Sequence, residues 1–153
     1  MDPEAKLREL GLELPAPPKP FAAYRTVVRS GDLLFVSGMG PVRDGKVAVQ
    51  GQVGKELSVA QGQEAARLTM LVTLAAVQEH LGSLAKVRRV VKCTVYVNAP
   101  AGFTEHPAVA NGATELLRSL WGEEGLPARA AVGVASLPMN IPVEIESIFE
   151  VAR

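Results

Sequence analysis

Arg129 is the residue of this sequence best suited to bind a small organic acid. It begins a predicted strand over residues 129–136, and because side chains alternate along a strand, Ala131 and Gly133 share its face. Those two residues have almost no side chain, which leaves room for a ligand beside the guanidinium. The guanidinium is a planar fork of donors that fits a carboxylate bidentately. We therefore predict an anion anchor at Arg129, and the competing interpretation is a surface arginine held in an ion pair.

Two carboxylates on the last predicted strand, residues 143–151, could assist the chemistry of such a ligand. Glu144 and Glu146 alternate with apolar residues, so they lie on one face of the strand. A carboxylate held near Arg129 could orient or deprotonate a water molecule. Glutamates spaced in this way are also typical of a solvated sheet face, so spacing alone leaves both interpretations open.

Other catalytic signatures fail on their spacing. The segment Gly38-Met39-Gly40 lacks the third glycine of a dinucleotide-binding loop, since Arg43 stands in that place. Gly54-Lys55 lacks both the first glycine and the hydroxyl residue of a phosphate-binding P-loop. Neither nucleotide-binding interpretation is kept.

The sulfur and imidazole residues predict no metal site. Cys93 is the only cysteine, and the two histidines, His80 and His106, have no spacing typical of a metal pair or a catalytic triad. We interpret Cys93 as a small strand residue rather than a nucleophile. A single cysteine also excludes an intramolecular disulfide and is typical of a reducing cytosol, so we expect a cytoplasmic protein.

The composition predicts one soluble domain. The chain has 153 residues, of which 48% are hydrophobic, and this length supports a single core. Sixteen basic and sixteen acidic residues give a net charge of zero, so we do not expect nucleic acid as the main partner. The longest nearly apolar stretch, residues 68–77, is too short to span a membrane. A mean hydropathy of +0.17 with 21% charged residues indicates that partners cover part of the surface.

The N-terminal part reads as a leader that precedes the domain. Asp2 and Pro3 are typical of a helix start, so we predict a short helix over residues 3–10. Residues 12–20 contain four prolines, which favour an extended connector. We therefore divide the chain into a leader helix and proline-rich connector, residues 1–20, and a single domain, residues 21–153.

Hydrophobic periodicity predicts the elements that position Arg129 and Glu144. Ser58 and Gln61 form a capping box at the start of a broad apolar helix that ends at Gly82, and a second helix begins near Pro107. Alternating or β-branched runs predict strands over residues 22–28, 33–37, 46–49, 87–98, 129–136 and 143–151. This order predicts an α+β fold with two helices on one face of a mixed or antiparallel sheet.

Several segments of the sequence resemble those of a known protein family. The segment 127–134, followed by Leu137-Pro138 and residues 143–146, resembles the C-terminal signature of the Rid superfamily, also called YjgF or endoribonuclease L-PSP. Upstream, Tyr24, the segment 34–38 and Asn111 resemble further elements of that family. The similarity covers about residues 20–152. The longer leader and residues 62–67 look like a branch distinct from the archetypal imine deaminases.

The resemblance implies a chorismate-mutase-like α+β fold, a homotrimer and clefts between neighbouring subunits. In the archetypal group, the arginine matching Arg129 holds the carboxylate of a 2-imino or 2-enamino acid. The glutamate matching Glu144 positions the water that attacks the imine carbon, which releases ammonia and a 2-oxo acid. Residues matching Tyr24, Ser37 and Asn111 line the same cleft. No metal or organic cofactor is implied.

Two departures from the archetypal pattern keep other functions open. Ala131 stands where archetypal members have a cysteine, and Met39 stands where many have glutamine. Ala131 leaves the anchor intact but changes the size and polarity of the pocket. The alternative to an imine deaminase is a trimer that binds small acids, or acts like a chaperone, without turnover. A ribonuclease ranks below both, because the sequence has balanced charge and no evident histidine pair for acid-base chemistry.

Overall fold

Caps and glycines place the ends of the helices where the sequence predicts them. A computed structural model describes residues 2–153, so residue 1 of the predicted leader lies outside the described residues. Helix α1 spans Pro3–Glu9, and the Asp2 side chain accepts a hydrogen bond from the backbone N–H of Glu4. Helix α2 spans Val59–Leu81 between the capping box at Ser58 and Gly82, whose φ of 84° needs a residue without a Cβ. Helix α3 spans His106–Trp121.

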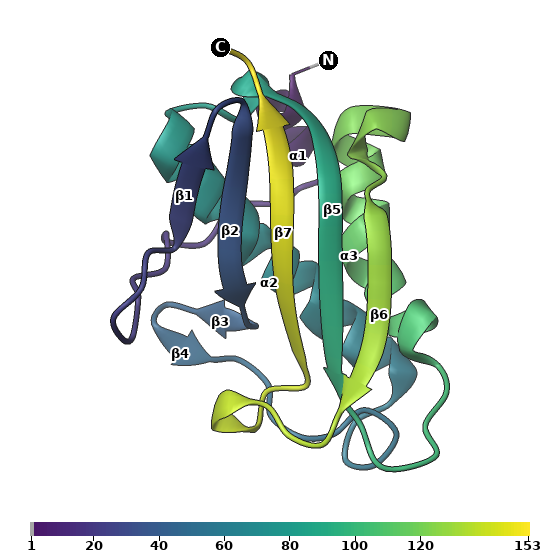
Figure 1. Ribbon diagram of the computed structural model, residues 1–153. Helices are drawn as coiled ribbons and strands as arrows, with labels where there is room; N and C mark the ends of the chain where they lie inside the picture. The colour runs from purple at the N-terminus through teal and green to yellow at the C-terminus, as the bar shows by residue number, and fades with distance from the viewer. Residues whose placement is uncertain (1) are drawn as a thin grey trace.

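Five strands form one mixed sheet in the order β1-β2-β7-β5-β6 (Figure 1). The strands are β1 Val27–Ser30, β2 Leu33–Met39, β5 Val87–Asn98, β6 Ala128–Val134 and β7 Val143–Val151. Strand β6 runs parallel to β5, and the other neighbours are antiparallel. A separate hairpin pairs β3, Val42–Arg43, with β4, Lys46–Val47. Helices α2 and α3 cover one face of the large sheet, and no helix within residues 2–153 lies on the opposite face (Figure 1).

The core lies between the sheet and these two helices. Strand β7 is central, and its alternate residues Val143, Ile145, Ser147, Phe149 and Val151 are buried, as the sequence pattern predicts. Burial of these residues orients the intervening Glu144 and Glu146 toward the uncovered face. The periodicity of the last strand therefore decides on which face the two carboxylates lie.

Cys93 is a core residue, as predicted. Its side chain is fully buried on β5. Burial raises the pKa of the thiol to about 11, although the positive charge of Arg129 acts in the opposite direction. At neutral pH the sulfur is therefore a thiol rather than a nucleophilic thiolate.

Three details differ from the sequence expectation. The strand predicted over residues 22–28 begins only at Val27. Before it, the Thr26 carbonyl still accepts a backbone hydrogen bond from the N–H of Ser37, but there β2 has an irregular register and regular pairing stops. The strand predicted over residues 46–49 ends at Val47. The strand predicted over residues 129–136 spans Ala128–Val134. Helix α1, which the sequence predicts, packs against α3 and the 3₁₀ turn Leu84–Lys86.

Glu4 attaches the leader helix to the rest of the protein. Its carboxylate accepts hydrogen bonds from Gln78 Nε2 at 2.9 Å, Ser83 Oγ at 2.9 Å and the backbone N–H of Leu84 at 3.0 Å. Burial opposes the charged form of Glu4, but these hydrogen bonds outweigh it and lower the pKa of the carboxyl group. The ionised Glu4 carboxylate therefore holds the leader helix against the C-terminal end of α2 and the turn that follows it.

We expect Glu4→Ala to lower the free energy of unfolding by about 1–3 kcal/mol at pH 7, because three hydrogen bonds to a carboxylate are lost. A lowered folded-state pKa stabilises the protein above the ordinary glutamate pKa of about 4.3, and this stability disappears as the pH falls through the lowered value. Urea unfolding of the unmodified protein and of Glu4→Ala, each at pH 7 and pH 3, measures the difference between their free energies of unfolding. This difference should be smaller at pH 3. The exposed Glu13→Ala is the control and should change stability by less than about 0.5 kcal/mol.

Candidate functional site

Arg129 projects from the edge strand β6 toward helix α3. In the parallel register Arg129 lies opposite Cys93, which faces the helices, and the arginine side chain turns to the same side. Its Nη1 donates to Asn111 Oδ1 at 2.7 Å and to Thr114 Oγ1 at 3.1 Å. Asn111 and Thr114 are three residues apart on α3, so both lie on the helix surface that meets β6. We call Arg129, Asn111 and Thr114 the arginine cluster.

The arginine cluster leaves most of the guanidinium available to a ligand. Within residues 2–153 the other N–H groups of Arg129 have no partner, and no carboxylate lies at ion-pair distance. The alternative of a surface arginine in an ion pair is therefore wrong for the described chain. Ala131, the next residue on this face of β6, is half-buried and adds only a methyl group beside the cluster. The free donors and the small neighbour together suit a carboxylate.

An imidazole lies farther along the same face of β6. A Cβ at Gly133 would come within 2.5 Å of His106 Nε2, so the histidine ring occupies the space above that glycine. The ring also meets Phe103 edge-on, with centroids 5.0 Å apart. His106 has no ligand-binding spacing in the sequence and was not predicted as a site residue. Only the contact between α3 and β6 places it on the Arg129 side of the sheet.

Glu144 lies on the uncovered face of the sheet. It pairs with Tyr96 on β5, and the hydroxyl group of Tyr96 donates to Glu146 Oε1 at 2.8 Å. On the other side, a Cβ at Gly38 would overlap the Glu144 carboxylate, so only glycine leaves that carboxylate in place. Burial, and then repulsion from Glu146, raise the pKa of Glu144 above the usual glutamate value.

A mostly apolar pocket of about 390 Å³ opens beside Glu144. Tyr24 lines it, and its hydroxyl group accepts a 3.4 Å hydrogen bond from the backbone N–H of Phe21, the residue that follows the connector. The remaining walls come from three segments: the connector, the end of β2 with the β3-β4 hairpin, and the loop before β7. We call this cavity the Glu144 pocket; its lining residues include Pro17, Pro18, Met39, Val72, Pro138 and Ile141.

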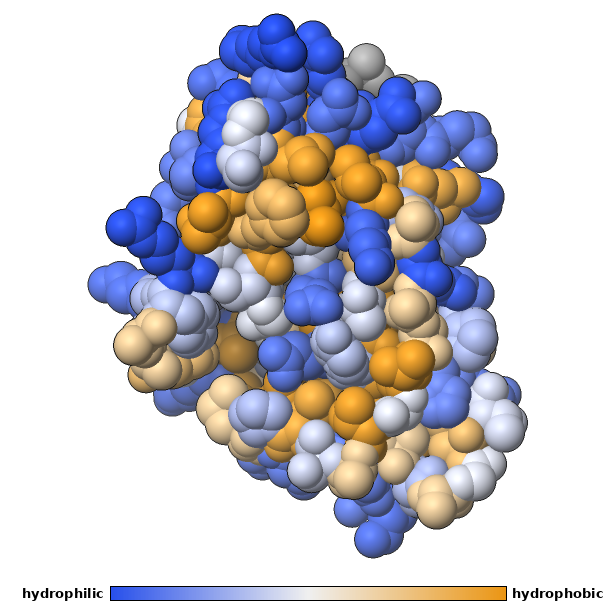
Figure 2. Space-filling view, viewed as in Figure 1, coloured by the Kyte–Doolittle hydropathy of each residue, from blue (hydrophilic) through white to orange (hydrophobic). Residues whose placement is uncertain are grey.

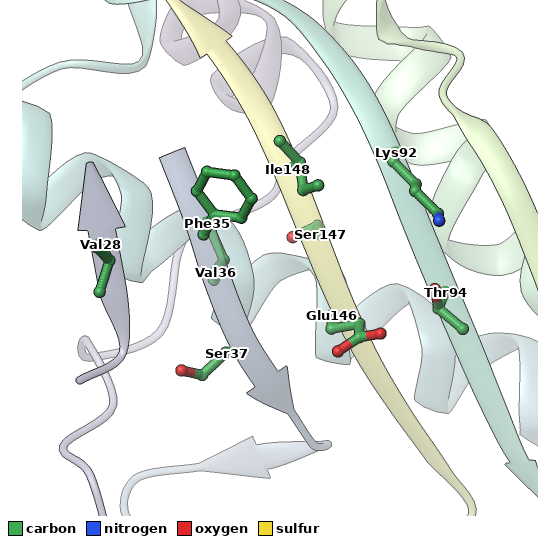
Figure 3. A pocket seen from close by; sticks show the side chains of 9 residues that line it. All are labelled: Val28, Phe35, Val36, Ser37, Lys92, Thr94, Glu146, Ser147 and Ile148. Atoms are coloured by element: carbon green, nitrogen blue, oxygen red, sulfur yellow. The ribbon is translucent and has the colours of Figure 1, made fainter. Parts of the chain in front are cut away.

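Ser37 lies next to the Glu144 pocket but lines a different hollow. Its hydroxyl group donates to the backbone carbonyl of Arg25, at the point where a bulge interrupts the pairing of β2 with β7. This hollow on the uncovered face has a volume of about 310 Å³. Figure 3 shows its lining side chains, with Phe35 and Ile148 at one end and Ser37, Thr94 and Glu146 toward the other. The Ser37 oxygen is therefore partly engaged by the backbone.

The predicted site residues thus form two groups that one chain does not bring together. Arg129, Asn111 and Ala131 lie on the helix side at β6, whereas Tyr24, Ser37 and Glu144 lie at β2 and β7. Two strand spacings separate β6 from β7, which is about 10 Å, and Glu144 is three residues along β7 from the row of Arg129. The two groups also face opposite sides of the sheet. A single chain therefore holds the Arg129 guanidinium and the Glu144 carboxylate in two separate places.

The described residues add no metal site and no membrane helix. Across residues 2–153 no three histidine, cysteine, aspartate or glutamate side chains are grouped closely enough to hold a metal ion. In the same part of the chain, no helix combines the length and apolar character needed to cross a membrane.

Comparison with known proteins identifies the family. The model of the endoribonuclease L-PSP family matches residues 15–151, which is most of the chain. The chain belongs to the endoribonuclease L-PSP family. The resemblance to the Rid/YjgF superfamily seen in the sequence is thereby confirmed.

Individual relatives of this L-PSP family member cover nearly the whole chain. "Protein TCP17" of Trypanosoma cruzi is 46% identical over 147 residues, covering 95% of this chain and 92% of the relative. A 2-iminobutanoate/2-iminopropanoate deaminase of Dermatophagoides farinae is 30% identical over 149 residues, covering 90% and 92%.

Two solved structures are similar to this chain over most of their length. The Agrobacterium tumefaciens protein Atu1372 superimposes with a TM-score of 0.91 at 45% identity, covering 98% of this chain and 92% of that one. E. coli TdcF, crystallised with bound serine, has a TM-score of 0.60 at 26% identity, covering 92% and 96%.

Sequence reasoning missed several residues that shape the two groups. Thr114 could have been found, since it lies three residues after Asn111 on a predicted helix. Gly38 was examined only as part of a nucleotide motif, although its position after Ser37 puts it beside Glu144 once the strands pair. Among the connector residues that line the Glu144 pocket, only the prolines form a distinctive sequence pattern, and this pattern does not indicate a pocket.

Proposed function

We propose that this L-PSP family member hydrolyses 2-imino or 2-enamino acids to 2-oxo acids and ammonia. The observation that carries the proposal is the arginine cluster, which holds one nitrogen of Arg129 and leaves the other donors free for a carboxylate. The deaminase from Dermatophagoides farinae, at 30% identity, supports the same chemistry. E. coli TdcF, which binds serine, supports an amino-acid-like ligand.

Glu144 is the group that acts on water in this proposal. An imine carbon is already electrophilic, so the site has to orient the substrate, place a water molecule and accept a proton. Glu144 is half-buried beside Gly38, and a raised pKa makes its carboxylate a better base. The proton taken from the attacking water is then available to the leaving ammonia.

We further propose that the chain works as a homotrimer with its sites between subunits. Arg129 and Glu144 face opposite sides of one sheet, so a site that uses both has to combine two chains. The uncovered face offers an interface: Val28, Phe35 and Val132 are 47%, 43% and 43% exposed there. Figure 2 shows a hydrophobic band across the upper part of this face. Exposed apolar patches of this kind mark association surfaces.

The test combines activity with assembly. Imines generated in place by an amino-acid oxidase should disappear faster with the protein than without it, and light scattering should give three times the chain mass of 16.2 kDa. Equal rates with and without protein would reject the deaminase. Binding of 2-oxo acids without turnover would favour the alternative of a non-catalytic small-acid-binding trimer, which the Ala131 departure motivates.

A variant on the uncovered face distinguishes an active site formed between subunits from an active site formed within one chain. Phe35→Glu should give single chains and no imine hydrolysis, although Arg129 and Glu144 are still present. Leu10→Glu is the matched control, because Leu10 is a similarly exposed apolar residue at the leader on the helix side. Full activity of a monomeric Phe35→Glu protein would contradict a site between subunits.

A further inference from the structure

We propose that the Glu144 pocket selects substrates with a bulky apolar side chain and that the proline-rich connector forms its outer wall. The inference rests on the proposed function in one respect, namely that the reacting carbon lies at Glu144. It goes further by assigning a substrate class, a monocarboxylic 2-imino acid with a branched aliphatic or aromatic substituent. It also assigns a role to residues 16–21, which precede the first strand.

The pocket has the size and lining of a small-molecule site. Its volume of about 390 Å³ lies within the range of roughly 300–1,000 Å³ that such sites occupy. Met39, Val72 and Ile141 supply aliphatic surface, and all three side chains are buried or nearly so. Met39, at the end of β2, makes this wall apolar. A methyl side chain would leave most of the cavity filled with water, whereas an isobutyl or benzyl group would displace that water.

The connector is built to hold a fixed wall. Pro17 and Pro18 line the pocket, and proline limits the backbone to an extended form that loses little further entropy when a ligand binds. The Tyr24 hydroxyl group holds the backbone N–H of Phe21, which keeps the end of the connector over the cavity. The Phe21 side chain is 73% exposed at the mouth of the pocket, where a ligand side chain can cover it.

Charge in the pocket disfavours acidic side chains. Apart from the Tyr24 phenol, the ionisable groups of the lining are Lys19, Asp44 and Glu144. Lys19 and Asp44 are exposed to solvent, while Glu144 is half-buried next to the apolar walls. A second carboxylate on the substrate would lose its hydration and meet Glu144 at short range. Imines derived from aspartate or glutamate are therefore expected to be poor substrates.

The experiment compares side chains within one assay on the full-length protein. An amino-acid oxidase generates the imines of alanine, leucine, phenylalanine and glutamate, and loss of each imine is followed with and without the protein. We expect kcat/KM for the leucine and phenylalanine imines to exceed the alanine value at least tenfold, since each buried methylene contributes about 0.8 kcal/mol. The glutamate imine should be the slowest.

Variants of the wall make the assignment specific. Phe21→Ala should lower the ratio of the leucine to the alanine kcat/KM at least fivefold, while Phe21→Leu, which preserves an apolar side chain, should retain most of it. Lys55→Ala, an exposed change outside the pocket, should leave the ratio unchanged. Equal kcat/KM for all side-chain sizes would overturn the pocket assignment and leave the deaminase proposal standing.

A binding measurement separates the two proposals if no imine is hydrolysed. Calorimetry with pyruvate and with 4-methyl-2-oxopentanoate reports the side-chain preference without turnover. At least tenfold tighter binding of 4-methyl-2-oxopentanoate, lost in Phe21→Ala, would support the pocket although the deaminase had failed. Equal Kd values, or no binding of either acid, would overturn the pocket assignment.

Discussion

Replacing Arg129 by alanine is expected to lower kcat/KM for 2-imino acids by about 100- to 1,000-fold. Truncating one partner of a desolvated charge pair costs about 2–5 kcal/mol, and each 1.4 kcal/mol corresponds to a factor of ten. The guanidinium is positioned in advance by Asn111 and Thr114, so its loss removes a preorganised partner for the substrate carboxylate. The effect should appear in KM and in the Kd of a 2-oxo acid measured by calorimetry.

Two further variants show whether the fork geometry or the charge alone is needed. Arg129→Lys keeps the charge but loses the second donor arm, so we expect it to recover only a small part of the loss. Arg88→Ala removes an exposed arginine elsewhere in the sheet and should have no effect on kcat/KM. A Kd for 2-oxo acids that is the same in Arg129→Ala and the unmodified protein would show that the anchor lies elsewhere.

Replacing Glu144 by glutamine is expected to lower kcat by about 10²- to 10⁴-fold with little change in KM. Glutamine keeps the shape of the side chain but cannot accept a proton from water, and general base catalysis typically contributes a factor of this size. Steady-state kinetics on the imine that the unmodified protein hydrolyses fastest measures kcat and KM separately. Wild-type kcat in Glu144→Gln would remove Glu144 from the mechanism.

The pH profile tests the same carboxylate without removing it. Activity requires ionised Glu144, so kcat should fall as the pH drops through its raised pKa. Glu146 contributes to that raised value by repulsion, and Glu146→Gln should therefore lower the pKa and move the acidic limb to lower pH. Gly38→Ala, whose Cβ overlaps the carboxylate, should reduce kcat without this shift in charge. An acidic limb at the same pH in Glu146→Gln would assign the limb to another group.

The pattern of side chains along the chain predicted most of the elements correctly. The predicted strand over residues 87–98 and the last strand coincide with β5 and β7, and the capping box at Ser58 and Gly82 bound α2 as expected. These signals are local, because caps, glycines and alternation act within a few residues of one another. Predictions that depended on a neighbouring strand were less accurate, as the late start of β1 shows.

The residue types of the candidate site were also readable from the sequence. Arg129 beside small residues, and Glu144 on a regular strand, follow from period-two alternation and need no knowledge of the fold. The same alternation explains why Cys93 is buried and inert. What could not be read was the set of contacts made through space, such as Asn111 and Thr114 on Arg129, or Gly38 beneath Glu144.

The sequence by itself determined which groups this protein can use, namely a guanidinium with space beside it and a carboxylate on an uncovered strand face. Only the tertiary structure decided that the two lie on opposite faces of one sheet, two strands apart. The physical reason is that strand order and pairing register are set by long-range packing against α2 and α3, which periodicity within a single segment does not encode. The same packing placed the connector over Glu144, so that its prolines line the pocket beside this residue.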